Sequence, residues 1–398
     1  MLLPSRNGAF DLEAPVSRRS LLTRLGFWRP RSRSVDLPNA MPLAEPQAQV
    51  TPQSTGRFKR HGRRSRTVLL SVLLGYLGIQ IAFILWADTR KPGMYDPEFY
   101  GRVKVLDQRR AEHPDQPMLL VFGSSRVVNL FRPERLEPVQ TADGQQVLVF
   151  NFSHTVAGPT YMYLSYRRLV EKGAVPRWVV LEIMPMIARK QDKNVYAGGI
   201  VASEFPWLAG QHETDDLAVE YLKTRLLPWE RLRSPIMYHF MPCIDVSPPS
   251  FVISGDYEDL GGLRLGTDAV ASDPEGMARQ IRDSVATKGP LMVTFKPDPR
   301  GERSLQALLE MCRQHGTKVA FLLSPESPAF RLYYTAEAYR QVGDYYSQMA
   351  SEWGAPFVDA REWLDESDFS DGHHAVYSGQ AKFTERLANE LLRDWVKK

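Results

Sequence analysis

The feature that most constrains this chain is a run of 21 residues without a charged side chain, from Thr67 to Ala87. A helix of that length spans about 30 Å, the thickness of the hydrocarbon core of a bilayer. Six of the ten residues before the run are Lys or Arg, and the positive-inside rule therefore predicts a cytoplasmic N-terminus. No small-residue cleavage site closes the run. We predict a transmembrane helix over residues 67–87 that is retained as a signal anchor, in preference to a buried core helix or a cleaved signal peptide.

The positive charge of the chain is concentrated before this helix. Residues 1–66 hold 13 Lys and Arg against four Asp and Glu, so the other 332 residues carry −5 within a total of +4. Proline, serine and glutamine are frequent in residues 1–66 without a sustained apolar period, which predicts a disordered basic cytoplasmic tail. The mildly acidic remainder lacks the clustered positive charge that nucleic acids require, so we predict no nucleic-acid partner.

Residues 88–398 alternate short apolar runs with helical patterns. Short buried strands separated by helices predict a parallel sheet covered by helices on both faces. The alternation is interrupted at about 186–302, where glycines, prolines and scattered aromatic residues predict an insertion in this extracytoplasmic domain. The expected strands are 118–122, 146–152, 178–183, 318–323 and 356–358, and the expected helices are 161–172, 304–315, 336–353 and 380–396.

One polar segment directly follows the first expected strand. In an open parallel sheet, ligands bind beyond the carboxyl ends of the strands, and Gly123-Ser124-Ser125-Arg126 lies there. A serine on a tight turn between strand and helix has an exposed hydroxyl, and its amide N–H is free to stabilise an oxyanion. By itself the segment is equally typical of a turn that caps a helix or of a phosphate-binding loop.

Two further polar segments follow the second strand and precede the last helix. Gly158 allows a backbone amide to approach a bound carbonyl closely, although an ordinary loop glycine before a proline is the simpler interpretation. Asp371 stands three residues before His374 on one loop, where a carboxylate can orient an imidazole and stabilise its charged form. His373 and His374 could instead be a pair of metal ligands, but without a further ligand nearby we predict no metal and no cofactor.

Together the three segments resemble the SGNH/GDSL hydrolase superfamily. The Gly-Asp-Ser motif of that superfamily is present here as Gly123-Ser124-Ser125, and its Asp-x-x-His motif matches Asp371 and His374. Its second-block glycine matches Gly158, which is followed by Pro and Thr where Gly-Asp-Thr is usual.

The resemblance covers residues 117–185 and 303–398. It implies an SGNH-like fold, which is a flavodoxin-like three-layer α/β sandwich with a parallel sheet. It also implies an acyl-enzyme mechanism on ester bonds. The implied catalytic residues are Ser125, His374 and Asp371, and the implied oxyanion hole consists of the backbone amides of Ser125 and Gly158.

The chain departs from the superfamily at the third block. Where Gly-x-Asn-Asp would supply an oxyanion-hole asparagine, this sequence has Leu-Glu-Ile-Met-Pro at 181–185. Loss of one such donor costs about 3 kcal/mol in a serine hydrolase, so slow hydrolysis or a specialised acyl acceptor is expected. Arg126, His154 and Glu182 are candidate substrate-binding residues. His154 is alternatively a solvent-facing loop residue, and Glu182 alternatively a buried hydrogen-bond acceptor.

The Gly-Ser-Ser variant, the missing asparagine and the single N-terminal anchor resemble one branch of the superfamily. This branch contains the alginate O-acetylation proteins and the D-alanyl transfer protein of lipoteichoic acid synthesis. The resemblance implies an O-acyltransferase, in the first instance an O-acetyltransferase, that is held in the bacterial inner membrane with its catalytic domain in the periplasm. It implies a cell-envelope or exported polysaccharide as acceptor and a membrane-bound O-acyltransferase as partner. Two alternatives stay open, namely an SGNH-type carbohydrate esterase or deacetylase and a catalytically silent assembly protein for the acyltransferase.

Overall fold

The computed structural model describes most of the chain from the apolar helix onward. The prediction of a disordered tail over residues 1–55, and much of the predicted insertion, lie outside the described residues. The chain divides into two units, of which the second is Arg66–Lys398. The described ranges are 56–189, 199–209, 214–226, 260–261, 274–288 and 293–398, with a few single positions between 228 and 241.

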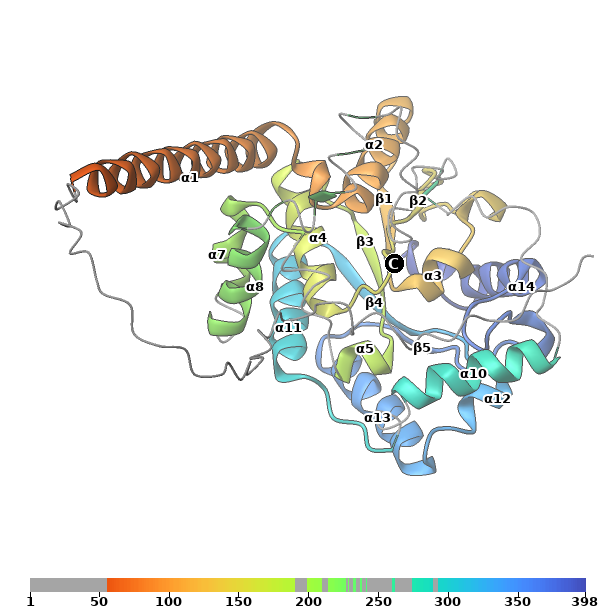
Figure 1. Cartoon of the computed structure of the whole chain (residues 1–398). Coiled ribbons are helices and arrows are strands. Elements are labelled where there is room, and N and C mark those ends of the chain that lie inside the picture. Colours follow the sequence, from red (N-terminus) through yellow and green to blue (C-terminus); the bar gives the residue numbers. More distant parts are fainter. Residues whose placement is uncertain are drawn as a thin grey trace, which may run out of the picture. The chain divides into compact units, whose positions relative to one another are not determined.

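Helix α1 (Gly56–Arg90, red-orange in Figure 1) contains the apolar run. Within the described residues its segment Ser65–Arg90 is the one helix long and apolar enough to cross a membrane, with a mean hydropathy of 2.4 and none of that apolar window buried. The helix begins at Gly56, so residues 56–66 are helical where we predicted disorder. Arg and Lys are good helix formers, and extending an existing helix avoids the cost of a new nucleus.

A parallel sheet of five strands lies at the centre of the second unit, in the order β2-β1-β3-β4-β5. Leu120 of β1 is paired with Phe150 of β2 on one side and with Val179 of β3 on the other. This order confirms the predicted flavodoxin-like sheet, and it puts the topological switch point beside the carboxyl end of β1. The strands are β1 (Met118–Phe122), β2 (Leu148–Asn151), β3 (Trp178–Glu182), β4 (Lys318–Leu323) and β5 (Phe357–Asp359).

Helices cover both faces of the sheet, which explains why every residue of β1 and β3 is buried. Leu120 and Phe122 of β1 join one core cluster, and the alternating Leu119 and Val121 join the other. The predicted three-layer sandwich is therefore confirmed. The first face packs against α2 (Pro97–Glu112), α4 (Pro159–Glu171), α11 (Pro299–Gln314) and α13 (Ala336–Glu352). The second packs against α3 (Ser125–Leu130), α10 (Pro274–Lys288), α12 (Pro328–Arg331), α14 (Tyr377–Leu387) and α15 (Arg393–Trp395).

Most of the described part of the segment between β3 and α11 is helical. It contains α5 (Pro185–Arg189), α7 (Phe205–Ala209), α8 (Thr214–Leu226) and α10. Met277 and Ile281 of α10 lie in the second core cluster, so this helix is part of the main body. Earlier in the segment, Arg225 of α8 forms an ion pair with Asp88 in the last turn of α1.

Candidate functional site

The turn after β1 places Ser125 at the first position of α3. Glycine is required at position 123, because a Cβ there would lie 2.8 Å from the side chain of Val127. Ser124 is fully buried and caps α3, since its Oγ accepts a hydrogen bond from the amide of Arg126 at 3.3 Å. Ser125 is partly exposed. Its hydroxyl therefore stands at the carboxyl end of the sheet, on a turn that is held by its buried neighbours.

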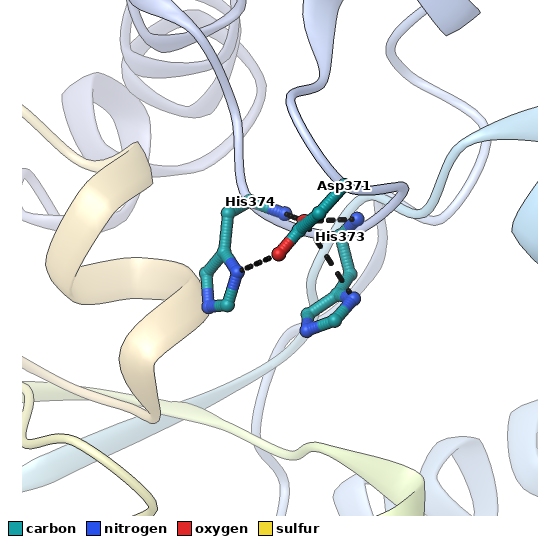
Figure 2. Close-up of side chains that lie close together, drawn as sticks. All are labelled: Asp371, His373 and His374. Carbon is teal, nitrogen blue, oxygen red and sulfur yellow. Dashed lines mark hydrogen bonds and ion pairs between the residues drawn. The ribbon is translucent and has the colours of Figure 1, made fainter. Parts of the chain in front are cut away.

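The second part of the site is the loop that precedes α14, drawn in Figure 2. Asp371 Oδ1 accepts hydrogen bonds from the amides of His373 at 3.1 Å and His374 at 2.8 Å. Gly372 has a φ of +90°, which L side chains rarely adopt, and a Cβ there would lie 2.9 Å from Ile281. This turn brings the carboxylate and both imidazoles to one side of the loop.

The two parts meet in a chain of three side chains. His374 Nε2 lies 3.0 Å from Ser125 Oγ, and His374 Nδ1 lies 2.6 Å from Asp371 Oδ2. Burial would raise the pKa of Asp371, but the hydrogen bond and the charge of His374 outweigh it and hold this pKa well below its ordinary value. An ionised carboxylate only accepts, so Nδ1 carries a proton, and in the neutral form of the imidazole Nε2 presents a lone pair to the Ser125 hydroxyl. The arrangement can remove a proton from Ser125.

Two backbone amides occupy helix N-termini at the positions named for the oxyanion hole. Ser125 is the first residue of α3, and Gly158 is the N-cap residue of α4. Neither amide donates a hydrogen bond to another described residue, as expected for the first N–H groups of a helix. The loop before Gly158 is strained, because Val156 has a φ of +60°. Val156 is the one non-glycine residue with a positive φ in the described part of the chain. Such strain costs about 1–3 kcal/mol and is common at functional sites. The oxyanion role of both amides stays a prediction.

Glu182, at the end of β3, supports the serine turn from inside the protein. Its carboxylate accepts hydrogen bonds from the Ser124 amide at 2.8 Å and hydroxyl at 3.4 Å, and from the Ser324 hydroxyl at 3.0 Å. Burial raises the pKa of Glu182, and the nearby Arg126 guanidinium only partly opposes this. The side chain is 0 % exposed. Of the two interpretations drawn from the sequence, the structure therefore gives Glu182 the role of a buried acceptor, out of reach of a substrate at the surface.

Arg126 is also enclosed, with 1 % of its surface exposed. Its guanidinium forms an ion pair with Glu326 at 2.7 Å and lies 5.7 Å from the ring of Phe330. Tyr334 donates a second hydrogen bond to the same carboxylate at 2.9 Å. Burial disfavours the charged guanidinium, but Glu326 more than compensates and the pKa of Arg126 is raised. Arg126 was named as a possible substrate contact, yet the structure uses it to fasten α3 to the segment after β4.

His154 lies in a buried charge cluster behind the β2 loop. Nδ1 is 2.8 Å from the carbonyl oxygen of Thr155, while Nε2 is 3.2 Å from Glu98 and 3.5 Å from Asp96. Both ring nitrogens face acceptors, and this arrangement favours the doubly protonated, charged imidazole. Burial lowers the pKa of His154, but the two carboxylates and the carbonyl raise it above its ordinary value. The His154 amide donates to the carbonyl of Gly123 at 2.9 Å, which fixes the β2 loop against the serine turn.

The loop before α14 also contains the one group of described side chains suited to a metal ion. The candidate ligand atoms of Asp371, His373 and His374 all lie within 4.8 Å of one another. The sequence suggested only the histidine pair, and the structure adds the carboxylate as a third ligand. Asp371 and His374 also belong to the chain of side chains that ends at Ser125.

Sequence reasoning missed the residues that hold the site together. Ser124 has a local signal, because a serine just before a helix is a typical N-cap. Ser324 and Glu326 follow β4 and could have been found by searching the carboxyl end of every strand for polar residues. Asp96 and Glu98 have no such signal, since their partner His154 lies more than 50 residues away in the sequence.

A family profile described as protein of unknown function (DUF1574) matches residues 98–205, and a second profile, which carries no description, matches residues 298–396. The two ranges contain the serine turn, Gly158 and the Asp371–His374 loop, and they exclude most of the segment between β3 and α11. A search of curated proteins finds no match.

Among solved structures, a candidate acylhydrolase from Bacteroides fragilis is similar to this chain. The alignment covers 75 % of this chain and 98 % of that one, at 12 % identity and a TM-score of 0.32.

Proposed function

We propose that this protein is a membrane-anchored enzyme that forms an acyl ester on Ser125 and passes the acyl group to a hydroxyl of a cell-envelope or exported polysaccharide. The observation that carries the proposal is the chain of contacts from Asp371 through His374 to Ser125, at 2.6 Å and 3.0 Å. Nucleophile, base and orienting carboxylate at these distances are the requirements of covalent acyl transfer.

In the first half-reaction, Ser125 attacks the carbonyl of an acyl donor. His374 Nε2 takes the hydroxyl proton as the new bond forms, and Asp371 stabilises the imidazolium that results. The oxyanion would be held by the Ser125 and Gly158 amides. His374 then returns the proton to the leaving group, and the acyl group remains on Ser125.

In the second half-reaction, a sugar hydroxyl takes the place of the leaving group. His374 removes the proton of this hydroxyl, which attacks the acyl carbonyl, and Ser125 Oγ leaves with that proton. The position of the missing third-block asparagine is occupied by the end of β3, where Glu182 is an acceptor rather than an oxyanion donor. With one donor fewer, hydrolysis slows by about 10² to 10³. Transfer to a sugar passes through the same kind of oxyanion, so the proposed transferase requires an acceptor whose binding energy offsets the missing donor, while the acyl intermediate persists against water.

The proposed location follows from α1. An exposed apolar helix preceded by a basic run suits a single-pass inner-membrane anchor with its N-terminus in the cytoplasm. The catalytic domain would then face the periplasm, beside exported glycans. A membrane-bound O-acyltransferase is the proposed source of the acyl group, because acyl donors made in the cytoplasm must be passed across the bilayer.

A carbohydrate esterase is the second candidate, and one observation favours it. Ser125 and His374 are both partly exposed, so water can reach the proposed acyl-enzyme. With water as acceptor the same two half-reactions remove an acyl group from a glycan.

The test uses the full chain in detergent with a fluorophosphonate probe and with an aryl acetate. We expect the probe to label Ser125 and the acetate to leave an acetyl group on the Ser125 peptide, as read by mass spectrometry. Ser125→Ala should abolish both signals. Ser351→Ala removes an exposed serine on α13 and is the matched control, which should behave like the wild type.

The fate of the adduct separates the candidates. An acetyl-Ser125 that persists in water and is discharged by added polysaccharide supports the transferase, whereas rapid discharge by water alone supports the esterase. A folded protein that is neither labelled nor acetylated would overturn both enzymatic proposals and leave the catalytically silent assembly protein.

A further inference from the structure

We propose that Asp371, His373 and His374 form a binding site for a zinc ion, and that zinc bound there inactivates Ser125 as a nucleophile. The proposed metal site depends only on the geometry and the donor atoms of the loop. The inactivation rests in addition on the proposed function, so the two parts can fail separately.

The distances between the candidate ligand atoms are close to those in a zinc site. Zinc holds nitrogen and oxygen ligands at about 2.0–2.2 Å in a tetrahedron, which separates neighbouring ligand atoms by roughly 3.3 Å. Here Asp371 Oδ2 is 2.6 Å from His374 Nδ1, and Asp371 Oδ1 is 3.7 Å from His373 Nδ1. The first pair is therefore about 0.7 Å shorter than zinc-ligand spacing and the second about 0.4 Å longer, differences that small rotations of the side chains remove.

The loop that carries the three ligands is held in place by hydrogen bonds and packing. Two backbone amides hold the Asp371 carboxylate, and the Gly372 carbonyl accepts a hydrogen bond from the Ser327 amide at 2.9 Å. The His373 ring packs against Phe330, with ring centroids 5.3 Å apart. Three ligands already gathered on one loop need little ordering when an ion binds.

The three side chains are donors that zinc prefers, and two of them are open to solvent. Two imidazoles and one carboxylate are a donor set that suits zinc among the divalent ions, whereas calcium and magnesium prefer oxygen ligands. The side chains of Asp371 and His374 are 23 % and 26 % exposed, so an ion can enter from solvent. A fourth position would remain for water. Figure 2 shows both rings and the carboxylate on the same side of the loop.

The consequence for Ser125 follows from the two nitrogens of His374. A neutral imidazole that binds zinc through Nδ1 carries its proton on Nε2. Nε2–H then donates to Ser125 Oγ and has no lone pair to accept the hydroxyl proton. Asp371, now a zinc ligand, no longer orients the ring. Zinc and the acyl-enzyme reaction thus compete for the same atoms, and the proton that leaves Nδ1 is regained at Nε2 through exchange with water.

The experiment measures binding and labelling separately on the full chain in detergent, carrying no polyhistidine tag and treated with chelator. Equilibrium dialysis with ⁶⁵Zn²⁺ should give one ion per chain, and fluorophosphonate labelling of Ser125 should fall as this site fills. His373→Ala should weaken zinc binding by at least about 10-fold and shift the inhibition of labelling by the same factor. His315→Ala removes an exposed histidine at the end of α11 and should change neither.

His373→Gln is a second variant in case the alanine variant does not fold, which thermal unfolding would reveal. Zinc binding that is absent, or equal in the wild type and a folded His373 variant, would overturn the site. Binding that depends on His373 but leaves labelling unchanged, or increases it, would overturn the inactivation. If metal-free protein is never labelled while zinc binding still depends on His373, the proposed function fails and the metal site stands.

Discussion

The buried carboxylate of Glu182 gives the sharpest test of how the serine turn is held. In Glu182→Ala, the Ser124 amide and the hydroxyls of Ser124 and Ser324 lose their common acceptor at a position that is 0 % exposed. An orphaned buried N–H costs about 1–3 kcal/mol, and removing one member of a buried charged network costs about 3–5 kcal/mol. We therefore expect the free energy of unfolding to fall by about 3–5 kcal/mol.

Glu182→Gln separates shape from charge. The glutamine oxygen can still accept from the Ser124 amide, and its NH₂ group can donate to the Ser324 hydroxyl, so the expected loss is about 1 kcal/mol. Labelling of Ser125 by a fluorophosphonate should stay within about 3-fold of the wild type for Gln and fall by more than about 10-fold for Ala.

The assay pairs urea unfolding with the labelling rate, measured where each variant is folded. Glu171→Ala removes an exposed carboxylate at the end of α4 and should change neither quantity. The reasoning is refuted if Glu182→Ala labels at the wild-type rate, because the turn would then hold its position without the carboxylate.

Three further predictions concern the same framework. Asp371→Asn should lower the acylation rate by about 10⁴-fold with little loss of stability, since an amide favours the wrong tautomer of the histidine; stopped-flow acylation with unchanged thermal unfolding would check this. His154 has a raised folded-state pKa, so its contribution to stability should be complete below about pH 6.5 and be lost as pH rises through the folded-state pKa. Melting temperatures from about pH 5 to pH 9 should show this slope in the wild type, and a His154→Gln variant with the same slope would contradict it. Gly123→Ala should lower the free energy of unfolding by about 1–3 kcal/mol through overpacking, as measured by urea unfolding. In the control Gly93→Ala the new Cβ would lie 3.4 Å from its nearest neighbour, so the free energy of unfolding should fall by under about 1 kcal/mol.

The sequence predicted the sheet well because buried parallel strands appear in the sequence as continuous apolar runs. The apolar runs of β1 and β3 begin where the strands begin, at Met118 and Trp178. The β2 run was predicted from 146 and the strand starts at Leu148, since the amide of Val147 donates its hydrogen bond to Val139 and the pairing with β1 begins one residue later. The start of α1 at Gly56 was missed because composition gives no boundary inside a basic run of good helix formers.

The site could be predicted only where its parts are local in sequence. Asp371 and His374 are three residues apart, and their spacing alone indicated that they interact. Arg126 and Glu326 are 200 residues apart, so no pattern could tell that this arginine faces inward. For Glu182 the sequence left two interpretations equally open, and only the packing of β3 against the serine turn separates them.

If α1 is anchored in a membrane as proposed, the short connection between α1 and α2 limits how far the following domain can lie from the bilayer. Six residues separate Arg90 from Pro97, and an extended segment of that length reaches at most about 20 Å. Asp96, the last of the six, forms an ion pair with Arg168 at 2.6 Å, so this tether is fastened to the body at its far end. The proposed membrane-anchored enzyme would search for its acceptor by lateral diffusion in two dimensions. A polymer emerging from an export channel would meet it at high local concentration, while a glycan released into the bulk would seldom return to its reach.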